Sequence, residues 1–247
     1  MSENDSLVND PLLARCLATG PAETRSQEIS VMRNIEKEYG IRGFCGLLKS
    51  LSSIRGEDLD IVLRVIARCR SDRVCRALTD LLVARPDEGA GICRSLLAFR
   101  TTRAVQRLSQ MLSSETQPDE VRYWSAASLG NTRTTKAIAP LCAALNNQYL
   151  ASTVRAQSAE SLGVIGASLD RRVRLSRMVE TALLAGLESE SVDIRFWCAF
   201  ALRDAGTMRS LPQLRRHYSD MTVCPGWWSI AKESKAAARA ISRRRAR

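Results

Sequence analysis

The chain has 247 residues, of which 45% are hydrophobic and 26% are charged, and its formal net charge is +11. This composition excludes general disorder, and no apolar run reaches the roughly 18 residues that a membrane-spanning helix needs. The N-terminal sequence MSENDSLVND is acidic where a signal peptide is basic and then apolar, so we expect a cytoplasmic protein.

The positive charge is concentrated near the C-terminus. Residues 1–190 carry 25 basic and 22 acidic side chains, whereas residues 191–247 carry 12 basic and 4 acidic ones. An excess of this kind favours contact with acidic proteins or with nucleic acid. The sequence therefore predicts that a partner surface, if it is electrostatic, lies at this end.

The first part of the chain predicts short helices that match the later repeats poorly: residues 11–20, 22–38 and 41–51. The first unit of a stacked repeat protein must present a polar outer side. We therefore interpret residues 1–56 as an N-terminal helical cap or a degenerate repeat.

From Glu57 onwards, apolar residues recur at helical spacing, and similar turns interrupt them at residues 70–73, 100–103 and 133–136. Each turn separates two apolar helices, which predicts helical hairpins that repeat every 30 to 33 residues. Acidic residues begin the first helix of each hairpin. We interpret them as side chains that offset the positive end of the helix, and not as catalytic pairs. These residues are Glu57, Asp58, Asp87, Glu88, Asp119, Glu120 and Asp193.

Residues 121–145 serve as the template of the repeat, because residues 154–163 match them after a shift of 33 positions and residues 194–202 after a shift of 73. The larger second step implies an insertion of about seven residues around positions 166–172. Three arginines then recur at helical spacing and share one face of a helix: Arg171, Arg174 and Arg177. That face is either simply solvated or a contact for an acidic partner.

The last segment, residues 221–247, predicts a capping helix with two different sides. The side expected to be buried carries Trp227, Ile230, Ala231, Ser234, Ala237, Ala238 and Ile241. The other side carries a basic ridge of Lys232, Lys235, Arg239 and Arg243.

The recurring pattern VRxxxAxxLG resembles HEAT-like repeats of the phycobilisome-lyase type. The matching residues are Val121, Arg122, Ala126, Leu129, Gly130, Ala137 and Ile138; then Val154, Arg155, Ala159, Leu162 and Gly163; then Ile194, Arg195, Ala199, Leu202, Leu211 and Pro212. The resemblance covers residues 57–220. It implies an all-α fold, a right-handed α-solenoid of antiparallel helix pairs, which mostly serves to bind other proteins. Some similar proteins attach bilin chromophores or excise alkylated bases from DNA, but no motif of those sites is found in this sequence.

Signatures of other enzyme classes are missing from the sequence, which has no nucleotide-binding, serine-hydrolase or zinc-protease motif. The eight cysteines are scattered without a CxxC pair, so we expect most of them to be core residues in a reducing compartment. His217 is the single histidine and is predicted to lie on the surface. These observations favour a protein without catalytic residues, metal or cofactor.

Two tryptophans, Trp124 and Trp197, allow two interpretations, which are stacking on nucleic-acid bases and packing in the core. Their spacing from the core positions Val121 and Ile194 favours core packing.

We predict a non-catalytic scaffold or adaptor whose concave helices and basic C-terminal surface bind a protein partner. The positive charge of that surface favours an acidic partner. The expected contact residues are Arg171, Arg174, Arg177, Arg215, Arg216, Lys232, Lys235, Arg239 and Arg243. The alternatives are a nucleic-acid-binding protein, including one of the DNA-glycosylase type, and a chromophore-handling subunit of the bilin-lyase type.

Overall fold

The structure is a computed structural model that describes residues 33–34, 37, 51, 53–66, 71–96, 99, 101–169 and 174–245. The helices predicted before residue 51 lie almost entirely outside these residues. The chain separates into two compact units, Met1–Phe99 and Arg100–Arg247. Each unit is described by itself below.

The described part of the first unit contains three α-helices and one 3-10 turn: α3 (Gly56–Ile66), α4 (Asp72–Ala84), η1 (Pro86–Glu88) and α5 (Gly89–Leu96). The hydroxyl of Ser71 caps α4 by accepting a hydrogen bond from the amide of Val74. Arg85, which is buried, ties the segment before α3 to the end of α4, because its guanidinium donates to the carbonyls of Ile54 and Leu51.

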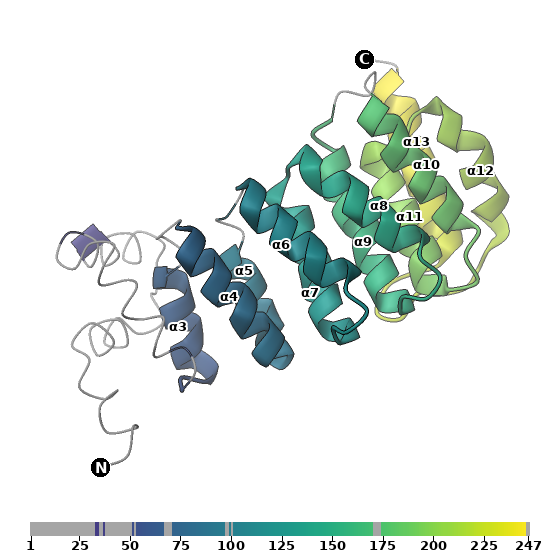
Figure 1. Ribbon diagram of the computed structural model, residues 1–247. Helices are drawn as coiled ribbons and strands as arrows, with labels where there is room; N and C mark the ends of the chain where they lie inside the picture. The colour runs from purple at the N-terminus through teal and green to yellow at the C-terminus, as the bar shows by residue number, and fades with distance from the viewer. Residues whose placement is uncertain are drawn as a thin grey trace, which may run out of the picture. The chain divides into compact units, whose positions relative to one another are not determined.

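The second unit contains the clearest repeats (Figure 1). Its elements are α6 (Thr102–Ser113), α7 (Asp119–Thr132), η2 (Thr135–Ala137), α8 (Ile138–Asn146), α9 (Ser152–Gly166), α10 (Arg174–Leu187), α11 (Val192–Ala205), η3 (Met208–Ser210), α12 (Leu211–Arg216), η4 (His217–Ser219) and α13 (Ile230–Arg245).

These helices form two layers, which we name the A layer (α7, α9, α11 and α13) and the B layer (α6, α8, α10 and α12). Within the second unit each A helix packs on the next A helix, and each B helix packs on the next B helix and on the A helix that follows it. Figure 1 shows the B layer in front and the A layer behind it. The predicted all-α solenoid of helix pairs is therefore confirmed.

Small residues allow the A helices to approach one another closely. A Cβ atom added to Gly130 would lie 2.8 Å from the Cα of Ser161, and one added to Gly163 would lie 2.8 Å from the Cα of Ala201. The hydroxyl of Ser161 also donates to the backbone carbonyl of Ala126 in the neighbouring helix, at 2.9 Å. Glycine, alanine and serine in the repeat pattern are thus the residues that set the spacing between successive A helices.

The arginine of the repeat pattern has a structural role. The last carbonyl groups of a helix lack partners within it, and a guanidinium near that end satisfies them. In all three template repeats, this arginine donates to carbonyls at or just after the end of the preceding B helix. The pairs are Arg122 with Ser114 (3.0 Å), Arg155 with Leu145 (2.9 Å), and Arg195 with Ser189 and Glu190 (2.8 Å each).

The acidic residues that we assigned to helix starts lie where expected. Glu57 and Asp58 fall in the first turn of α3, Asp119 and Glu120 in that of α7, and Asp193 in that of α11. The inserted residues fall between α9 and α10, and residues 170–173 of that connection, which include Arg171, lie outside the described residues. Among the described helices, none is long and apolar enough to cross a membrane.

The close A-layer packing makes Gly163 sensitive to one added methyl group. We expect Gly163→Ala to lower the free energy of unfolding by about 1–3 kcal/mol, because the new Cβ meets the backbone of α11, which cannot move aside as a flexible side chain can. Urea unfolding of the full chain, followed by circular dichroism, measures this change.

The matched control is Gly91→Ala in α5, where the one close contact of the new Cβ is with the movable carboxylate of Asp60, and Leu63 lies at an ordinary 3.6 Å. We expect this variant to be less destabilised than Gly163→Ala. Since alanine is intrinsically favoured over glycine in a helix, a Gly163→Ala protein more stable than the wild type contradicts the close-contact interpretation.

Candidate functional site

One stripe of each A helix remains accessible to solvent. On α9 the stripe is Gln157, Glu160 and Val164, all of which are half-buried, while the residues between them are mostly buried. The spacing of three and four residues places such a stripe on one side of a helix. The equivalent positions are Trp124, Ala127 and Asn131 on α7, of which Ala127 is buried, and Trp197, Phe200 and Arg203 on α11. We call the surface formed by these nine residues the A-layer face.

The packing between A helices brings these stripes into register. Gly130 of α7 lies against Ser161 of α9, and Gly163 of α9 lies against Ala201 of α11. These contacts align Trp124 with Gln157 and Gln157 with Trp197, one position to the next across three helices. The A-layer face therefore carries a tryptophan at each edge of a polar centre.

The polar centre of this face is a partly buried carboxylate. Glu160 accepts a hydrogen bond from the side-chain amide of Gln157 at 2.9 Å. Burial raises the pKa of Glu160 above its ordinary value, and the hydrogen bond from Gln157 opposes this change only in part.

Aromatic side chains gather at the C-terminal end of the A layer. The ring of Phe196 is fully buried and lies 5.5 to 5.8 Å from the rings of Trp197, Trp227 and Trp228. Trp197 also contacts Phe200 at 5.3 Å. Pairs at such distances and at steep angles attract one another through their quadrupoles. The cluster joins α11 to the segment that precedes α13.

A buried carboxylate, Glu233, lies beneath this cluster. Its side chain is 1% exposed, and its Oε2 accepts the indole N–H of Trp228 at 2.8 Å. Its Oε1 lies 3.9 Å from Nη1 of Arg203, an ion-pair distance that is too long for a hydrogen bond. The guanidinium of Arg203 also lies 4.2 Å from the ring centre of Phe200.

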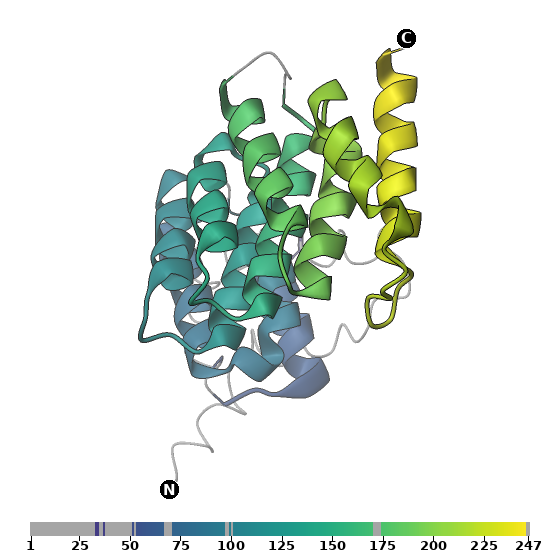
Figure 2. The ribbon, with the colours of Figure 1, turned by 90° about the vertical axis from the view of Figure 1, so that its right-hand side faces the viewer.

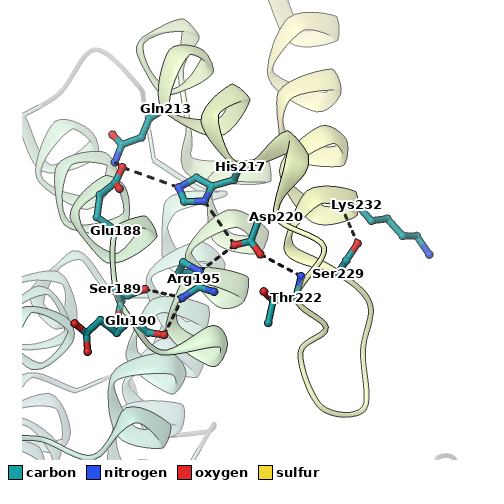
Figure 3. Close-up of polar contacts among 10 residues, drawn as sticks. All are labelled: Glu188, Ser189, Glu190, Arg195, Gln213, His217, Asp220, Thr222, Ser229 and Lys232. Carbon is teal, nitrogen blue, oxygen red and sulfur yellow. Dashed lines mark hydrogen bonds and ion pairs between the residues drawn. The ribbon is translucent and has the colours of Figure 1, made fainter.

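A second polar network connects α10, α11 and η4 (Figure 3). Arg195 contacts the carboxylate of Asp220 at 3.2 Å, and the imidazole of His217 lies between Asp220 (3.9 Å) and Glu188 (4.0 Å). The side-chain amide of Gln213 donates to Glu188 at 2.8 Å. The His217 side chain is only 13% exposed. Our prediction of a surface histidine is therefore wrong, because η4 folds back over the ends of α10 and α11.

Asp220 holds the start of the loop that leads to α13. Partial burial alone raises the pKa of its carboxyl group, but hydrogen bonds from Thr222 and the charge of Arg195 together lower the pKa below its ordinary value. The Asp220 carboxylate accepts the amide N–H of Thr222 at 3.1 Å. Its backbone carbonyl accepts the amide of Ala231 at 2.8 Å. This residue therefore fixes both ends of the loop.

The arginines predicted as contacts on α10 and α12 are exposed but do not form one patch. Arg174 and Arg177 lie in the first turns of α10, whereas Arg215 and Arg216 lie in the last turn of α12. The two helices run in parallel, because Thr207 contacts Glu180 and Gln213 contacts Leu184. The two pairs therefore occupy opposite ends of the B layer, about 15 Å apart along the axis at 1.5 Å per residue.

The basic ridge is exposed along α13, as the sequence predicts. Lys232, Lys235, Arg239 and Arg243 are all exposed, while Ile230, Ala231, Ser234, Ala237, Ala238 and Ile241 are buried. The ammonium of Lys232 lies 4.6 Å from the ring centre of Trp228. That of Lys235 lies 5.7 Å from the ring centre of Tyr218.

Three aromatic positions differ, wholly or in part, from the sequence interpretation. Trp124 and Trp197 are half-buried on the A-layer face; Trp197 packs against the buried cluster around Phe196, as predicted in part, whereas Trp124 is not among the buried residues. Trp227, predicted on the buried side of the last helix, precedes α13 and is 45% exposed. The helices α7 and α11 each have neighbours on two sides. The spacing of the tryptophans from Val121 and Ile194 fits a buried side or the accessible side of such a helix, so periodicity alone did not separate core from surface.

The described cysteines are buried and are not joined in disulfides: Cys75, Cys93, Cys142, Cys198 and Cys224. Burial raises the pKa of Cys142 to about 12. Burial and the nearby Asp193 carboxylate also raise that of Cys224 to about 12. A thiol with such a pKa is a poor nucleophile at neutral pH. Within the described part of the chain, no group of three or more His, Cys, Asp or Glu residues is placed to hold a metal ion.

Comparison with known proteins agrees with the repeat interpretation. The family described as HEAT repeats matches residues 77–163, so this part of the chain consists of HEAT-like repeats. No curated protein matches the chain.

Solved structures with a similar course of the chain include an engineered protein (18% identity, 96% of this chain and 69% of that one, TM-score 0.48). Human deoxyhypusine hydroxylase in complex with glycerol is another (14% identity, 98% of this chain and 100% of that one, TM-score 0.44). A third is a computationally designed armadillo repeat protein for modular peptide recognition (14% identity, 94% of this chain and 98% of that one, TM-score 0.47).

The lowered pKa of Asp220 makes the stability of the fold depend on pH. Since the folded pKa lies below the ordinary value of 3.8, the carboxylate stabilises the fold above that pH, and this contribution is lost as the pH falls through the folded pKa. We expect Asp220→Asn to be less stable than the wild type at neutral pH. The difference should shrink as the pH falls below about 4. Urea unfolding over a pH series measures it.

Glu115→Gln is the control, because it removes an exposed carboxylate from the loop before α7. A difference between Asp220→Asn and the wild type that stays constant down to the lowest pH contradicts the role assigned to this ion pair.

Proposed function

We propose that this HEAT-like repeat protein is a non-catalytic scaffold that binds a protein partner on the A-layer face. The architecture supports the role of scaffold or adaptor, because a stack of helix pairs offers one long surface to which every repeat contributes. From the resemblance to repeats of the phycobilisome-lyase type, this proposal uses only the repeat architecture. We assign no described residue to bilin attachment or to base excision.

The observation that carries the proposal is the composition of the A-layer face. Three large aromatic residues, Trp124, Trp197 and Phe200, lie half-buried on it. A helix surface that contacts only water is usually polar or charged. Tryptophan and other aromatic residues are enriched at the centres of protein interfaces, where each provides a large contact area and little conformational entropy is lost.

The charged groups of this face already have partners within the protein. Glu160 is hydrogen-bonded to Gln157, and Arg203 lies over Phe200 and near Glu233. Desolvating these groups on binding therefore costs less than desolvating free surface charges. The outer side of the B layer differs, since it carries exposed cations such as Arg174 and Arg177.

Variants of the A-layer face test the proposal. We expect Trp124→Ser combined with Glu160→Lys to remove the main protein recovered when the tagged full chain is purified from its native extract and analysed by mass spectrometry. Loss of a central aromatic contact typically costs about 2 kcal/mol or more of binding, or some thirtyfold in affinity. The midpoint of thermal unfolding shows whether the variant is folded.

The matched control changes the B layer by Thr181→Ser combined with Arg177→Glu, both at exposed positions of α10. Retention of the protein by the A-layer variant, together with its loss from the B-layer variant, contradicts the assignment of the surface. Recovery of no protein by the wild type contradicts the proposed scaffold function itself.

A second candidate function is nucleic-acid binding along the basic ridge. The observation in its favour is the line of exposed cations on α13, at spacings of three and four residues. Cations in such a line can contact successive phosphates without reading the base sequence. Removing α13 is an unsuitable test, because its buried residues Ile230, Ala237 and Ile241 cover α11 and their loss would damage the fold.

Charge reversal tests this second candidate without removing the helix. If the ridge binds DNA, then Lys235→Glu, Arg239→Glu and Arg243→Glu together abolish binding to a generic duplex. The affinity of the wild type should fall with salt, by a slope of about 0.9 for each phosphate contact. Fluorescence anisotropy over a salt series measures both effects.

The control triple, Arg174→Glu, Arg177→Glu and Arg209→Glu, makes the same change of charge on α10 and η3. Equal loss in both triples indicates a general effect of net charge. Absence of binding by the wild type removes nucleic acid from consideration.

A further inference from the structure

The loop between η4 and α13, residues 220–229, exposes apolar side chains although it is tightly held. Met221 is 71% exposed, Val223 59% and Trp227 45%. These three residues are half of the large hydrophobic residues that lie exposed in the described part of the chain. Figure 2 shows the loop projecting at the N-terminal end of α13. We call this segment the apolar loop.

Backbone hydrogen bonds close the apolar loop into a defined shape. The amide of Cys224 donates to the carbonyl of Trp228 at 3.2 Å, that of Trp227 to Cys224 at 2.9 Å, and that of Ile230 to Thr222 at 3.0 Å. Val223 and Ser229 form an antiparallel bridge. The loop therefore presents its side chains in one conformation, which lowers the entropy lost on binding.

Contacts with the repeats anchor the apolar loop from behind. Cys224 is 2% exposed, and its thiol lies 3.3 Å from the carboxylate of Asp193. Arg195 holds Asp220 at 3.2 Å, as Figure 3 shows. Trp227 packs at 5.7 Å against the buried ring of Phe196. While these contacts fix the loop, the side chains of Met221 and Val223 remain exposed to water.

Between Met221 and Lys235 the exposed charged side chains are all positive, although the half-buried carboxylate of Asp193 on α11 contacts the Cys224 thiol at 3.3 Å. From Met221 to Lys235, the exposed side chains include three large apolar residues, Lys232 and Lys235, but no carboxylate. The one carboxylate of this segment, Glu233, is buried beneath Trp228, and that of Asp220, just before the segment, is paired with Arg195. Lys232 lies over Trp228 and has no carboxylate partner among the described residues. This surface is complementary to a ligand that is both apolar and acidic.

We propose that the apolar loop, with Lys232, is the docking site for an acidic amphipathic segment of the protein partner. The partner's apolar side chains cover Met221, Val223 and Trp227, and its carboxylates meet Lys232 and Lys235. This inference rests on the proposed scaffold function and names the chemistry of the partner. An anionic membrane surface shares part of that chemistry and is distinguished by the test.

The probe is a fluorescein-labelled helical peptide of about 14 residues, or about four turns, with Leu and Phe on one face and Glu on the other. A matched peptide replaces every Glu by Lys. Fluorescence anisotropy measures the binding of both to the full chain. We expect the acidic peptide to bind and the basic peptide to bind at least about tenfold more weakly.

Two variants test the site. Met221→Ser combined with Val223→Ser removes exposed apolar area, and Lys232→Glu reverses the flanking charge; we expect each to weaken the acidic peptide by about tenfold or more. Their matched controls are Tyr149→Ser, at a residue that is 98% exposed on another loop, and Arg177→Glu on α10. The controls should bind the peptide as the wild type does.

Several results overturn the proposal. These are absence of peptide binding by the wild type, equal binding of the acidic and basic peptides, and equal losses in variants and controls. If the peptide does not bind, and the wild type sediments with phosphatidylserine-containing vesicles while the loop variants do not, the loop is assigned to a lipid surface instead. If the loop variants still recover the native partner that the A-layer variant loses, the scaffold function stands and this docking site is rejected.

Discussion

The close approach of successive A helices is the constraint on which the rest of the second unit depends. It is set at backbone level, by Gly130 against Ser161 and Gly163 against Ala201, where a larger residue meets main-chain atoms. Because the contact positions repeat along the chain, each helix adopts the same register as the one before it. The tryptophans and the polar centre of the A-layer face are aligned only because that register is fixed.

The recurring arginine adds a second constraint, between the layers. By donating to carbonyls at the end of the preceding B helix, it ties the start of each A helix to the element before it. In the last of these repeats the same residue has a further contact, since Arg195 also binds Asp220. A structural side chain of the repeat is thereby used to position the apolar loop, which is an addition to the repeat pattern.

The distribution of charge has consequences for partner recognition. The cations are divided among the start of α10, the end of α12 and the outer side of α13, whereas the A-layer face has Glu160 at its centre and an arginine engaged with aromatic and acidic neighbours. In the proposed binding, the net charge supplies the long-range field that raises encounter rates, and the A-layer face and the apolar loop supply the short-range contacts. One partner can use both, if its acidic segment reaches α13 while its apolar side chains cover the tryptophans.

The sequence by itself determined the helical repeat, the positions of the turns, the acidic helix starts and the exposed ridge of α13, because each depends on local spacing or on groups within one helical turn. It placed Trp124 and Trp227 in the core and His217 on the surface, and the structure places them otherwise, while Trp197 is half-buried against the cluster around Phe196. Which flank of a helix meets water depends on which neighbours cover it, and the folding of η4 over α10 and α11 joins residues far apart in the chain. For the same reason only the tertiary structure decided that Asp220, Cys224 and Glu233 point inward while Met221, Val223 and Lys232 face solvent: these orientations arise from contacts with α11, which no local pattern in residues 220–235 encodes.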